Sequence, residues 1–378
     1  MHEYIIGKSG TGKSTFLRNL ILNNEGGFAV LDPHGDLAEV IADTIECIYF
    51  DPSELQLGFN VLENVSQEKR PLVAAQIIAS FKAIWGDSWG HRMEWILMNS
   101  LRLLLDNNHT LLGLTKLLTN DSYRAHLLRK CSDPVIRAFW DTEFARYDDR
   151  FRKEAIAPIQ NKVGQLLANP TLRNILGQQN STLKVDRIMN KGQRLIVNLS
   201  KGKLGEEPSH LLGALLVSGF YEAAQRRATI PENERVPFTL YVDEFQNFAT
   251  ESFATILSEA RKFKLSLVLA HQFLGQLPDL LRQAVFGNVG VMTAFRVGAE
   301  DAPIIAAELG LGNPTALIDL SNFQAYTRKG GPYNFKFIQT EPPRPTAHRL
   351  ASVKRFTKAS YTRPKRLVEI AIERFLTN

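Results

Sequence analysis

The stretch IIGKSGTGKSTFL, near the start of the chain, contains the residues with the clearest chemical meaning. Residues 7–14 fit the pattern G-x-x-x-x-G-K-[ST], in which glycines let backbone N–H groups converge on phosphate oxygens. The N-terminus of a helix that follows adds its dipole to the same site. We therefore expect a loop that binds a nucleoside triphosphate through Gly7, Lys8, Ser9, Gly10, Thr11, Gly12, Lys13, Ser14 and Thr15.

Two positions of this loop and a second motif suggest catalysis. Lys13 is expected to reach the β- and γ-phosphates of ATP, and the Ser14 hydroxyl to hold Mg²⁺. The motif LYVDEF places Asp243 and Glu244 directly after an apolar run. The first acid would complete the Mg²⁺ shell, and the second would act as the general base on the attacking water. A helix cap and a surface charge are the alternative, but beside a phosphate loop the pair favours hydrolysis.

A third polar position follows the next apolar run, LVLAHQ, which ends at Gln272. A glutamine near the γ-phosphate can orient the attacking water or sense the phosphate. A polar loop residue without a role in catalysis is the alternative. We expect the neighbouring His271 to be structural.

Apolar segments alternate with helical segments along the chain. This alternation predicts an α/β fold with a mostly parallel sheet, whose strands would position these residues. A helix is expected to begin at Lys13. The sequence FQAYTRKGGPYNFKFIQ predicts a hairpin that turns at Gly330, Gly331 and Pro332. The expected strands are residues 3–7, 27–32, 47–51, 194–200, 238–245, 265–272 and 289–297.

A long helical stretch interrupts the strands between residues 66 and 190. Its apolar residues recur at i, i+3 and i+4, as in Met93, Ile96, Leu97, Leu101, Leu104 and Leu105. We divide the chain into an ATPase motor domain of residues 1–65 and 191–341, an all-α insertion domain of residues 66–190, and a basic C-terminal tail of residues 342–378.

The positive charge is concentrated in this tail. The net charge is +6, and residues 342–366 hold eight lysines and arginines and no acid. Such a tail can contact phosphate backbones, although a solvated or disordered tail is an equal alternative. Its prolines argue against regular structure before the last residues, RLVEIAIERFLTN, which predict a short amphipathic helix.

Composition also excludes some classes of protein. No apolar run of about 18 residues is present, so we expect no membrane span. The most apolar stretch, residues 211–224, is interrupted by Glu222 and predicts a buried helix. Two cysteines without disulfide or metal spacing, and no secretion signal, suit the cytoplasm. The NKVG at 161–164 lacks the aspartate of the GTPase motif N-K-x-D.

Several motifs in a fixed order give a more specific resemblance. They are IGKSGTGKSTFL, LDPHGDL, FNVLE, LYVDEFQNF, EARKFKLSLVLAHQFLGQL and FGNVGVMTAFRVGAEDA. In this order they resemble the HerA–FtsK superfamily of P-loop ATPases, in its conjugative coupling-protein (TraD/TrwB-like) branch of type IV secretion. The resemblance covers roughly residues 7–302, loosely in the helical insertion.

This resemblance implies a RecA-like P-loop fold and a homo-oligomer, a hexameric ring that pumps DNA with ATP bound between neighbouring subunits. In that family an arginine before the strand that follows the acidic motif reaches the neighbour's ATP. Arg261, in EARKF, occupies the matching position. Arg296, in TAFR, is the second candidate for a finger or sensor. A solvated surface position is the alternative for both residues.

The motif LDPHGD and the short segment before the loop give weaker indications than the motifs above. Asp32, in LDPHGD, ends a strand beside the loop and is expected to face the nucleotide or a neighbouring subunit. Asp36 is expected to cap the next helix. Only six residues precede the loop, which leaves no room for the membrane helices or the β-barrel that usually open such proteins. A natural minimal motor, a fragment, and a subunit whose anchor is a separate protein are the alternatives that this short start leaves open. We expect a cytoplasmic location, peripheral to the inner membrane or to a secretion channel where a separate partner anchors the protein.

Two functional hypotheses follow. The first is an ATP-driven hexameric DNA translocase. The second is a nucleotide-dependent scaffold or adaptor ring, or a protein-secretion ATPase that does not move DNA. Glu244, Gln272 and Arg261 favour a motor, because a scaffold needs none of them for chemistry.

Overall fold

The chain forms two compact units in a computed structural model that describes residues 1–86, 89–250, 252–331 and 334–377. One unit is built on a sheet and is called the sheet unit; it comprises Met1–Phe50, Val185–Gly202 and Phe220–Thr357. The other is the helical unit; it comprises Asp51–Lys184, Lys203–Gly219 and Lys358–Asn378.

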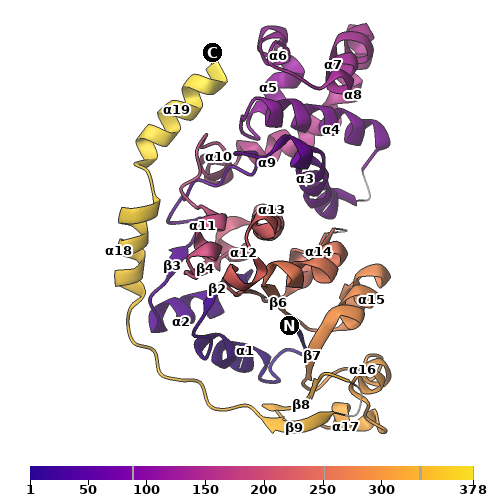
Figure 1. The fold of residues 1–378 in the computed structure, drawn as a ribbon, viewed down its shortest axis with the longest axis vertical. Coiled ribbons are helices and arrows are strands. Elements are labelled where there is room, and N and C mark those ends of the chain that lie inside the picture. The colour runs from indigo at the N-terminus through magenta and orange to yellow at the C-terminus, as the bar shows by residue number, and fades with distance from the viewer. Residues whose placement is uncertain (87–88, 251, 332–333, 378) are drawn as a thin grey trace. The chain divides into compact units, whose positions relative to one another are not determined.

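A nine-stranded sheet runs through the described residues of the sheet unit (Figure 1). Its order is β3-β4-β2-β5-β6-β1-β7-β8-β9, and only β8 and β9 run antiparallel to their neighbours. The strands are β1 (His2–Ile6), β2 (Gly27–Asp32), β3 (Ile48–Phe50), β4 (Arg194–Asn198), β5 (Phe238–Val242), β6 (Leu265–His271), β7 (Val289–Ala294), β8 (Gln324–Lys329) and β9 (Phe335–Gln339).

Helices cover this sheet, which explains why its central strands are mostly apolar and largely buried. Every residue of β2 is buried. α1 (Lys13–Leu22) packs against α2 (Asp36–Thr44), and α14 (Phe253–Glu259) packs against α15 (Asp279–Asn288) (Figure 1). The remaining short helices are α11 (Val185–Asn190), α16 (Ala302–Leu309), α17 (Thr315–Ile318), η6 (Arg227–Thr229), η7 (Glu232–Glu234), η8 (Phe245–Asn247), η9 (Ala260–Phe263) and η10 (Leu274–Gln276).

The α/β fold expected from the sequence is confirmed, and so is each expected strand. The largest differences are in β7, which ends at Ala294 and not at Val297, and in β5, which ends at Val242 and not at Phe245. The backbone turns after β5 because Glu244 adopts a left-handed conformation with φ 45°. The β8–β9 hairpin is also confirmed, with Gly330 at φ 84°, whereas Pro332 lies outside the described residues.

The helical unit contains the long helical stretch expected from the sequence. In α4 (His91–Asp106) the apolar residues at helical spacing are buried, as the pattern predicted. Several helices begin at a capping side chain, for example Asp133 before α7 and Asn169 before α10. The other elements are η1 (Gln67–Lys69), α3 (Arg70–Trp85), α5 (Gly113–Thr119), α6 (Asp121–Leu128), α7 (Pro134–Ala138), η3 (Phe139–Glu143), η4 (Phe144–Arg146), α8 (Asp149–Ile159), η5 (Gln160–Gly164), α9 (Gln165–Ala168) and α10 (Pro170–Leu176).

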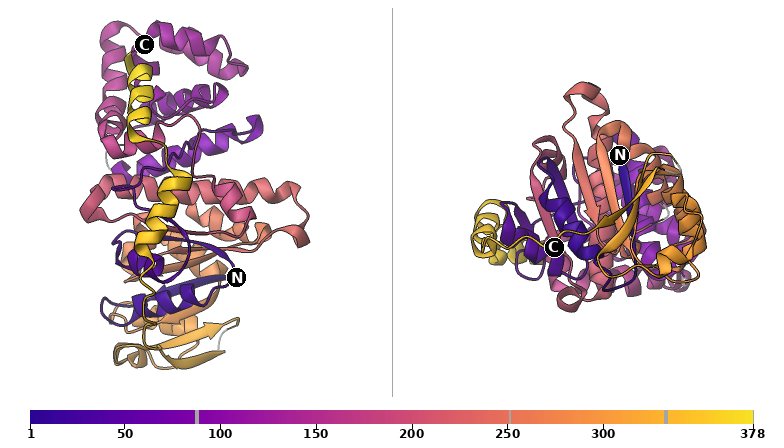
Figure 2. Two further views of the ribbon diagram at one scale, coloured as in Figure 1. Left: turned by 90° about the vertical axis from the view of Figure 1, so that its left-hand side faces the viewer. Right: turned by 90° about the horizontal axis from the view of Figure 1, so that it is seen from below.

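The C-terminal tail is more regular than the sequence suggested. It forms two helices, α18 (Leu350–Tyr361) and α19 (Lys365–Thr377), separated by a short break (Figure 2). Only α19 was expected. Pro342, Pro343 and Pro345 lie before α18, and Pro364 lies in the break before α19. α18 buries Val353 and Thr357 and exposes most of its basic residues.

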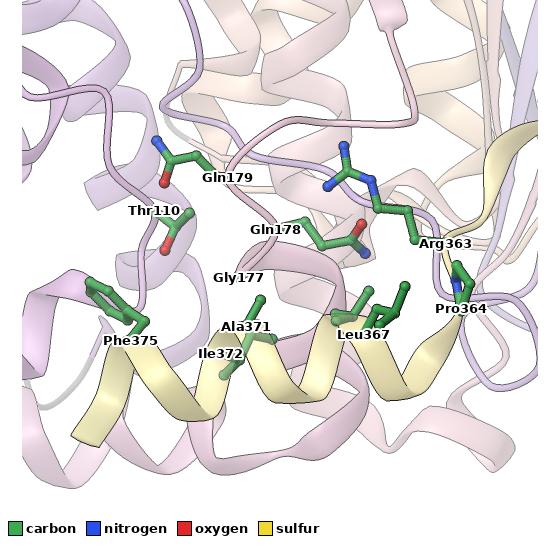
Figure 3. A pocket seen from close by; sticks show the side chains of 11 residues that line it. Thr110, Gly177, Gln178, Gln179, Arg363, Pro364, Leu367, Ala371, Ile372 and Phe375 are labelled. Atoms are coloured by element: carbon green, nitrogen blue, oxygen red, sulfur yellow. The ribbon is translucent and has the colours of Figure 1, made fainter. Parts of the chain in front are cut away.

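Within the helical unit, α19 packs through Val368 and Ile372. The Lys116 ammonium donates to the Phe375 carbonyl at 2.6 Å. Beside α19 lies a cavity of about 300 Å³ (Figure 3), lined by Thr110, Gly177, Gln178, Gln179, Arg363, Pro364, Leu367, Val368, Ala371, Ile372 and Phe375.

Along the chain, three helices pass from one unit to the other: α12 (Lys201–Leu204), α13 (Glu206–Arg226) and α18. α13 includes the apolar residues 211–224, which form a largely buried helix as expected. Among the helices that the structure describes, none has the length and apolarity needed to cross a membrane.

Candidate active site

The phosphate loop lies between β1 and α1, and its glycines are required by its conformation. Gly10 and Gly12 have φ values of 76° and 104°, which other residues rarely adopt. A Cβ atom on Gly12 would also lie 2.8 Å from Cδ1 of Phe323. The Thr11 hydroxyl donates to the Lys8 carbonyl at 2.8 Å and closes the loop.

The first half of the loop is open to solvent, which is compatible with phosphate binding. Lys8, Ser9 and Gly10 are exposed, and the Lys8 N–H donates to the Arg296 carbonyl at 2.9 Å. A Cβ on Gly7 would lie 2.5 Å from Cβ of Phe295, so this position also needs glycine. α1 begins at Lys13 as expected, with Ser14 exposed and Thr15 half-buried in its first turn.

Three neighbouring strand ends bring the predicted catalytic residues together. β6 lies between β5 and β1 in the sheet, and all three run parallel. Because parallel strands end at one edge, the acidic motif after β5, Gln272 after β6 and the loop after β1 meet there. This edge is called the carboxyl edge below.

Glu244 is the centre of a buried hydrogen-bond cluster at this edge. Its Oε1 accepts from the Lys13 ammonium at 3.0 Å and from the Gln272 amide at 3.0 Å, and its Oε2 accepts from the Gln246 amide at 2.8 Å. Burial alone would raise the pKa of Glu244, but the charge of Lys13 and these hydrogen bonds outweigh it and lower the pKa. Left-handed backbone is uncommon for a glutamate, and such strain often marks a functional position.

Asp243 has the opposite electrostatic situation. Burial, together with the negative charges of Asp32 and Glu244, raises its pKa to about 7 against the opposing effect of Lys13. The Glu244 N–H donates to its Oδ1 at 3.1 Å. A buried carboxylate among like charges fits a divalent cation, and carboxylate and hydroxyl oxygens are ligands that Mg²⁺ accepts. Asp243 and Ser14 are therefore a suitable donor set for Mg²⁺.

Asp32 is fully buried, and both of its oxygens are engaged by backbone. They accept from the N–H groups of His34 and Ala38, each at 2.9 Å. Ala38 lies in the first turn of α2, so Asp32 and not Asp36 supplies the side-chain bond at this helix end; that expectation was wrong. Gly35, with φ 96°, is the N-cap residue of α2, and Asp36 is the first residue of the helix. A direct contact between Asp32 and nucleotide stays a prediction.

The two candidate arginines lie in different places. Arg296 is at the carboxyl edge, where its guanidinium donates to the Asn322 side chain at 3.0 Å and to the Leu320 carbonyl at 3.4 Å. Arg261 is exposed in η9, directly before β6. β6 is seven residues long, so Arg261 lies roughly 20 Å from the Gln272 end of the strand. It does not join the site of its own chain.

His271 is structural, as expected. It is fully buried, its Nδ1 is 3.0 Å from the Tyr4 hydroxyl, and its ring contacts Phe245. Burial, and then the charge of Lys13, lower its pKa to about 3. A histidine with so low a pKa is a weak base.

Two residues at the site were missed from the sequence. Gln246, two residues after the proposed base, could have been noticed as a donor in DEFQNF. Phe323 carries no local signal, because it precedes a strand far along the chain from the loop that it touches.

Comparisons with known proteins agree with this geometry. No protein-family model and no curated protein matches the sequence. Among solved structures, the coupling protein TrwB in complex with sulphate is 17% identical and superposes with a TM-score of 0.69 over 92% of this chain and 87% of that chain. TrwB in complex with ADP and Mg²⁺ is 16% identical and superposes with a TM-score of 0.66 over the same shares of the two chains.

The fold is that of the conjugative coupling protein TrwB. VirB4 of Thermoanaerobacter pseudethanolicus shares it more distantly, with 13% identity and a TM-score of 0.57 over 90% of this chain and 89% of that chain. The resemblance drawn from the motifs is thus confirmed at the level of the fold, which is that of a P-loop ATPase with a helical unit.

Proposed function

We propose that this protein is an ATP-driven motor that moves DNA and works as a homo-oligomeric, hexameric ring. The observation that carries the proposal is the cluster of Lys13, Glu244 and Gln272, bonded together at the ends of three adjacent strands. Binding alone needs the lysine but has no use for a buried base and a polar sensor. The fold shared with TrwB, described as a conjugative coupling protein, supports the choice of motor.

Lys13 and the backbone N–H groups of the loop would hold the phosphates. Ser14 and Asp243 would hold Mg²⁺, which when bound neutralises charge on the β- and γ-phosphates. TrwB has been solved with ADP and Mg²⁺ and with the ATP analogue ADPNP, in line with this assignment.

Glu244 would accept a proton from the attacking water. Its Oε1 shares the Lys13 ammonium, for which phosphate oxygens would compete. Phosphate binding would thus draw Lys13 away and leave Glu244 bonded to Gln246 and Gln272. Gln272 would then connect the Glu244 carboxylate to the γ-phosphate. The strength of Glu244 as a general base would therefore depend on which nucleotide is bound.

The ring enters the proposal through Arg261. An exposed arginine at the opposite edge of the sheet cannot serve its own site but can serve a neighbour's. An arginine finger stabilises charge on the transferring phosphoryl group and is worth about 10³–10⁵ in rate. Arg296 is the second candidate, although its bonds to Asn322 and Leu320 hold it beside its own loop.

DNA would contact the ring through basic surface, including the tail. Arg355, Lys358, Arg363, Lys365 and Arg366 are exposed there. We propose three functional domains: a motor domain of residues 1–65 and 191–341, an insertion of residues 66–190 and a tail of residues 342–378. We propose a cytoplasmic location, where ATP is supplied, with attachment to the inner membrane made through a separate partner.

The test is steady-state ATP hydrolysis by wild type and Glu244→Gln, with no nucleic acid and with single- or double-stranded DNA, at two salt concentrations. We expect DNA to stimulate hydrolysis and the substitution to lower it by about 10²–10⁴-fold. The exposed residue Glu25 provides a matched control, Glu25→Gln, which should keep wild-type activity.

Other outcomes would select other functions. Hydrolysis that depends on Glu244 but ignores DNA would indicate a protein-secretion ATPase. No hydrolysis, with assembly still dependent on Lys13, would indicate a scaffold ring.

A further inference from the structure

Phe323 occupies an unusual position on the phosphate loop. Its N–H donates to the Thr11 carbonyl at 2.7 Å, and its own carbonyl accepts from the Thr340 N–H at 2.7 Å. The ring is nevertheless 42% exposed. Two short backbone bonds thus fix a large apolar side chain at the surface of the loop.

The backbone of Phe323 is also strained. Its φ is 68°, in the left-handed region that bulky residues rarely adopt. Such conformations persist where the surroundings impose them and are frequent at ligand sites. A polar or glycine residue would satisfy this turn with less strain, so the aromatic ring needs another explanation.

The ring lies beside the first turn of α1. A Cβ on Gly12 would be 2.8 Å from its Cδ1, and Gly12 directly precedes Lys13. Phe323 leads into β8, which lies beyond β7 on one side of β1, whereas β6 and β5 lie on the other side. Phe323 and the Glu244 cluster therefore flank the loop from opposite sides.

Phe323 and the Glu244 cluster lie where the two ends of a nucleotide bound to the loop would lie, the base at Phe323 and the γ-phosphate at Glu244. If the γ-phosphate lies at Glu244 and Gln272, the base leaves the loop on the side away from β6. We propose that Phe323 is the platform on which the base of the bound nucleotide stacks, an inference that rests on the proposed nucleotide site. An aromatic face stacks on any base, so the ring would add affinity without selecting adenine over guanine.

The test compares a nucleotide with a ligand that lacks the base. Isothermal titration calorimetry would measure the affinities of ADPNP and of tripolyphosphate, each with Mg²⁺, for wild type and Phe323→Leu. The matched control is Phe337→Leu, since Phe337 is 50% exposed on β9 of the same hairpin, where its ring packs against Tyr326. Thermal melting of each variant would establish that it folds.

We expect Phe323→Leu to weaken ADPNP binding by about 5- to 100-fold. Tripolyphosphate binding should stay within about twofold of wild type, because it lacks the group that stacks. Phe323→Tyr should keep the affinity for ADPNP. Phe323→Trp should gain a fluorescence change with ADPNP that is absent with tripolyphosphate.

Three results would overturn the proposal. Unchanged ADPNP affinity in Phe323→Leu would show that the ring does not stack on the base. Equal weakening of both ligands would show that Phe323 supports only the loop. Wild type that binds tripolyphosphate as tightly as ADPNP would show that the base contributes nothing, whereas binding of neither ligand would remove the proposed nucleotide site itself.

Discussion

The two edges of the central sheet carry different kinds of functional residue. At the carboxyl edge, Lys13, Glu244 and Gln272 are bonded to one another, and the lysine and the glutamate are buried. The opposite edge, where the parallel strands begin, is called the amino edge. Arg261 is exposed there, and among the described residues no hydrogen bond or ion pair holds its guanidinium. The proposed base and sensor are thus fixed within one chain, whereas the role proposed for Arg261 requires a second chain that faces it.

This contrast also has an energetic side. The Lys13–Glu244 pair is desolvated, with 6% of each side chain exposed, so loss of one partner leaves an uncompensated charge in the interior. Changes at the carboxyl edge therefore mix effects on catalysis with effects on stability. An exposed arginine can be removed with little effect on stability, and its loss reports on catalysis alone.

The largest effect is expected at the amino edge. Arg261→Ala should lower kcat by about 10³-fold or more, because transition-state charge loses its stabilisation, while ADPNP affinity and the melting temperature stay unchanged. Steady-state hydrolysis under conditions of assembly would measure it. Lys262→Ala, which removes the neighbouring exposed cation and its 3.4 Å ion pair with Glu259, should stay within a few-fold of wild type. Equal behaviour of the two variants would exclude a finger at Arg261.

A smaller effect concerns how η9, which carries Arg261, is held. The buried Arg227 donates to the Asn190 side chain at 2.9 Å and to the carbonyls of Val236 and Phe263 at 2.9 and 3.2 Å. Arg227→Met would leave these acceptors without their donor and should lower the free energy of unfolding by about 2–4 kcal/mol. Urea unfolding would measure the loss, with Arg226→Met, at a half-buried position, as the control. A loss below about 0.5 kcal/mol would show that these bonds do not hold the edge.

The smallest effect is a pH dependence at the carboxyl edge. The pKa of His271 is about 3 in the folded protein, below its ordinary value of 6.5, because burial and Lys13 disfavour the charged ring. The unfolded chain therefore takes up a proton that the folded chain does not, and stability present above pH 6.5 is lost as the pH falls. This histidine contributes a slope of about 1.4 kcal/mol per pH unit below that point.

Unfolding free energies at pH 7.5, 6.5 and 5.5 would test this slope. His271→Gln should flatten it, whatever its effect at pH 7.5, and the exposed His91→Gln should not. The same slope in wild type and His271→Gln would contradict the assignment.

The sequence predicted most of what lies at the carboxyl edge, because its motifs are local. The glycine spacing of the loop, the acids after β5 and the polar end of β6 each lie within a short stretch whose strand or helix context can be read from hydrophobicity. What could not be predicted depends on contacts distant in the chain. Phe323 meets Gly12 only through the arrangement of β8, and Asp32 takes over the bond expected of Asp36 because Gly35 reorients the backbone.

The tail and the amino edge show two further limits of sequence reasoning. α18 forms between Pro345 and Pro364, and the prolines on both sides drew attention away from a helix that buries only Val353 and Thr357. Arg261 has no local feature that separates a finger from a solvated cation. That difference is a property of a pair of chains and not of one sequence.

The most direct test of the account is to mix two inactive variants, Glu244→Gln and Arg261→Ala, under conditions in which subunits exchange. A subunit that keeps Glu244 would then meet a neighbour that keeps Arg261, and one complete site would form between them. We predict that the mixture hydrolyses ATP faster than the two variants do separately. A mixture that exchanges subunits, as fluorescence energy transfer would establish, but gains no activity would contradict the proposal that Arg261 acts on the neighbour's ATP.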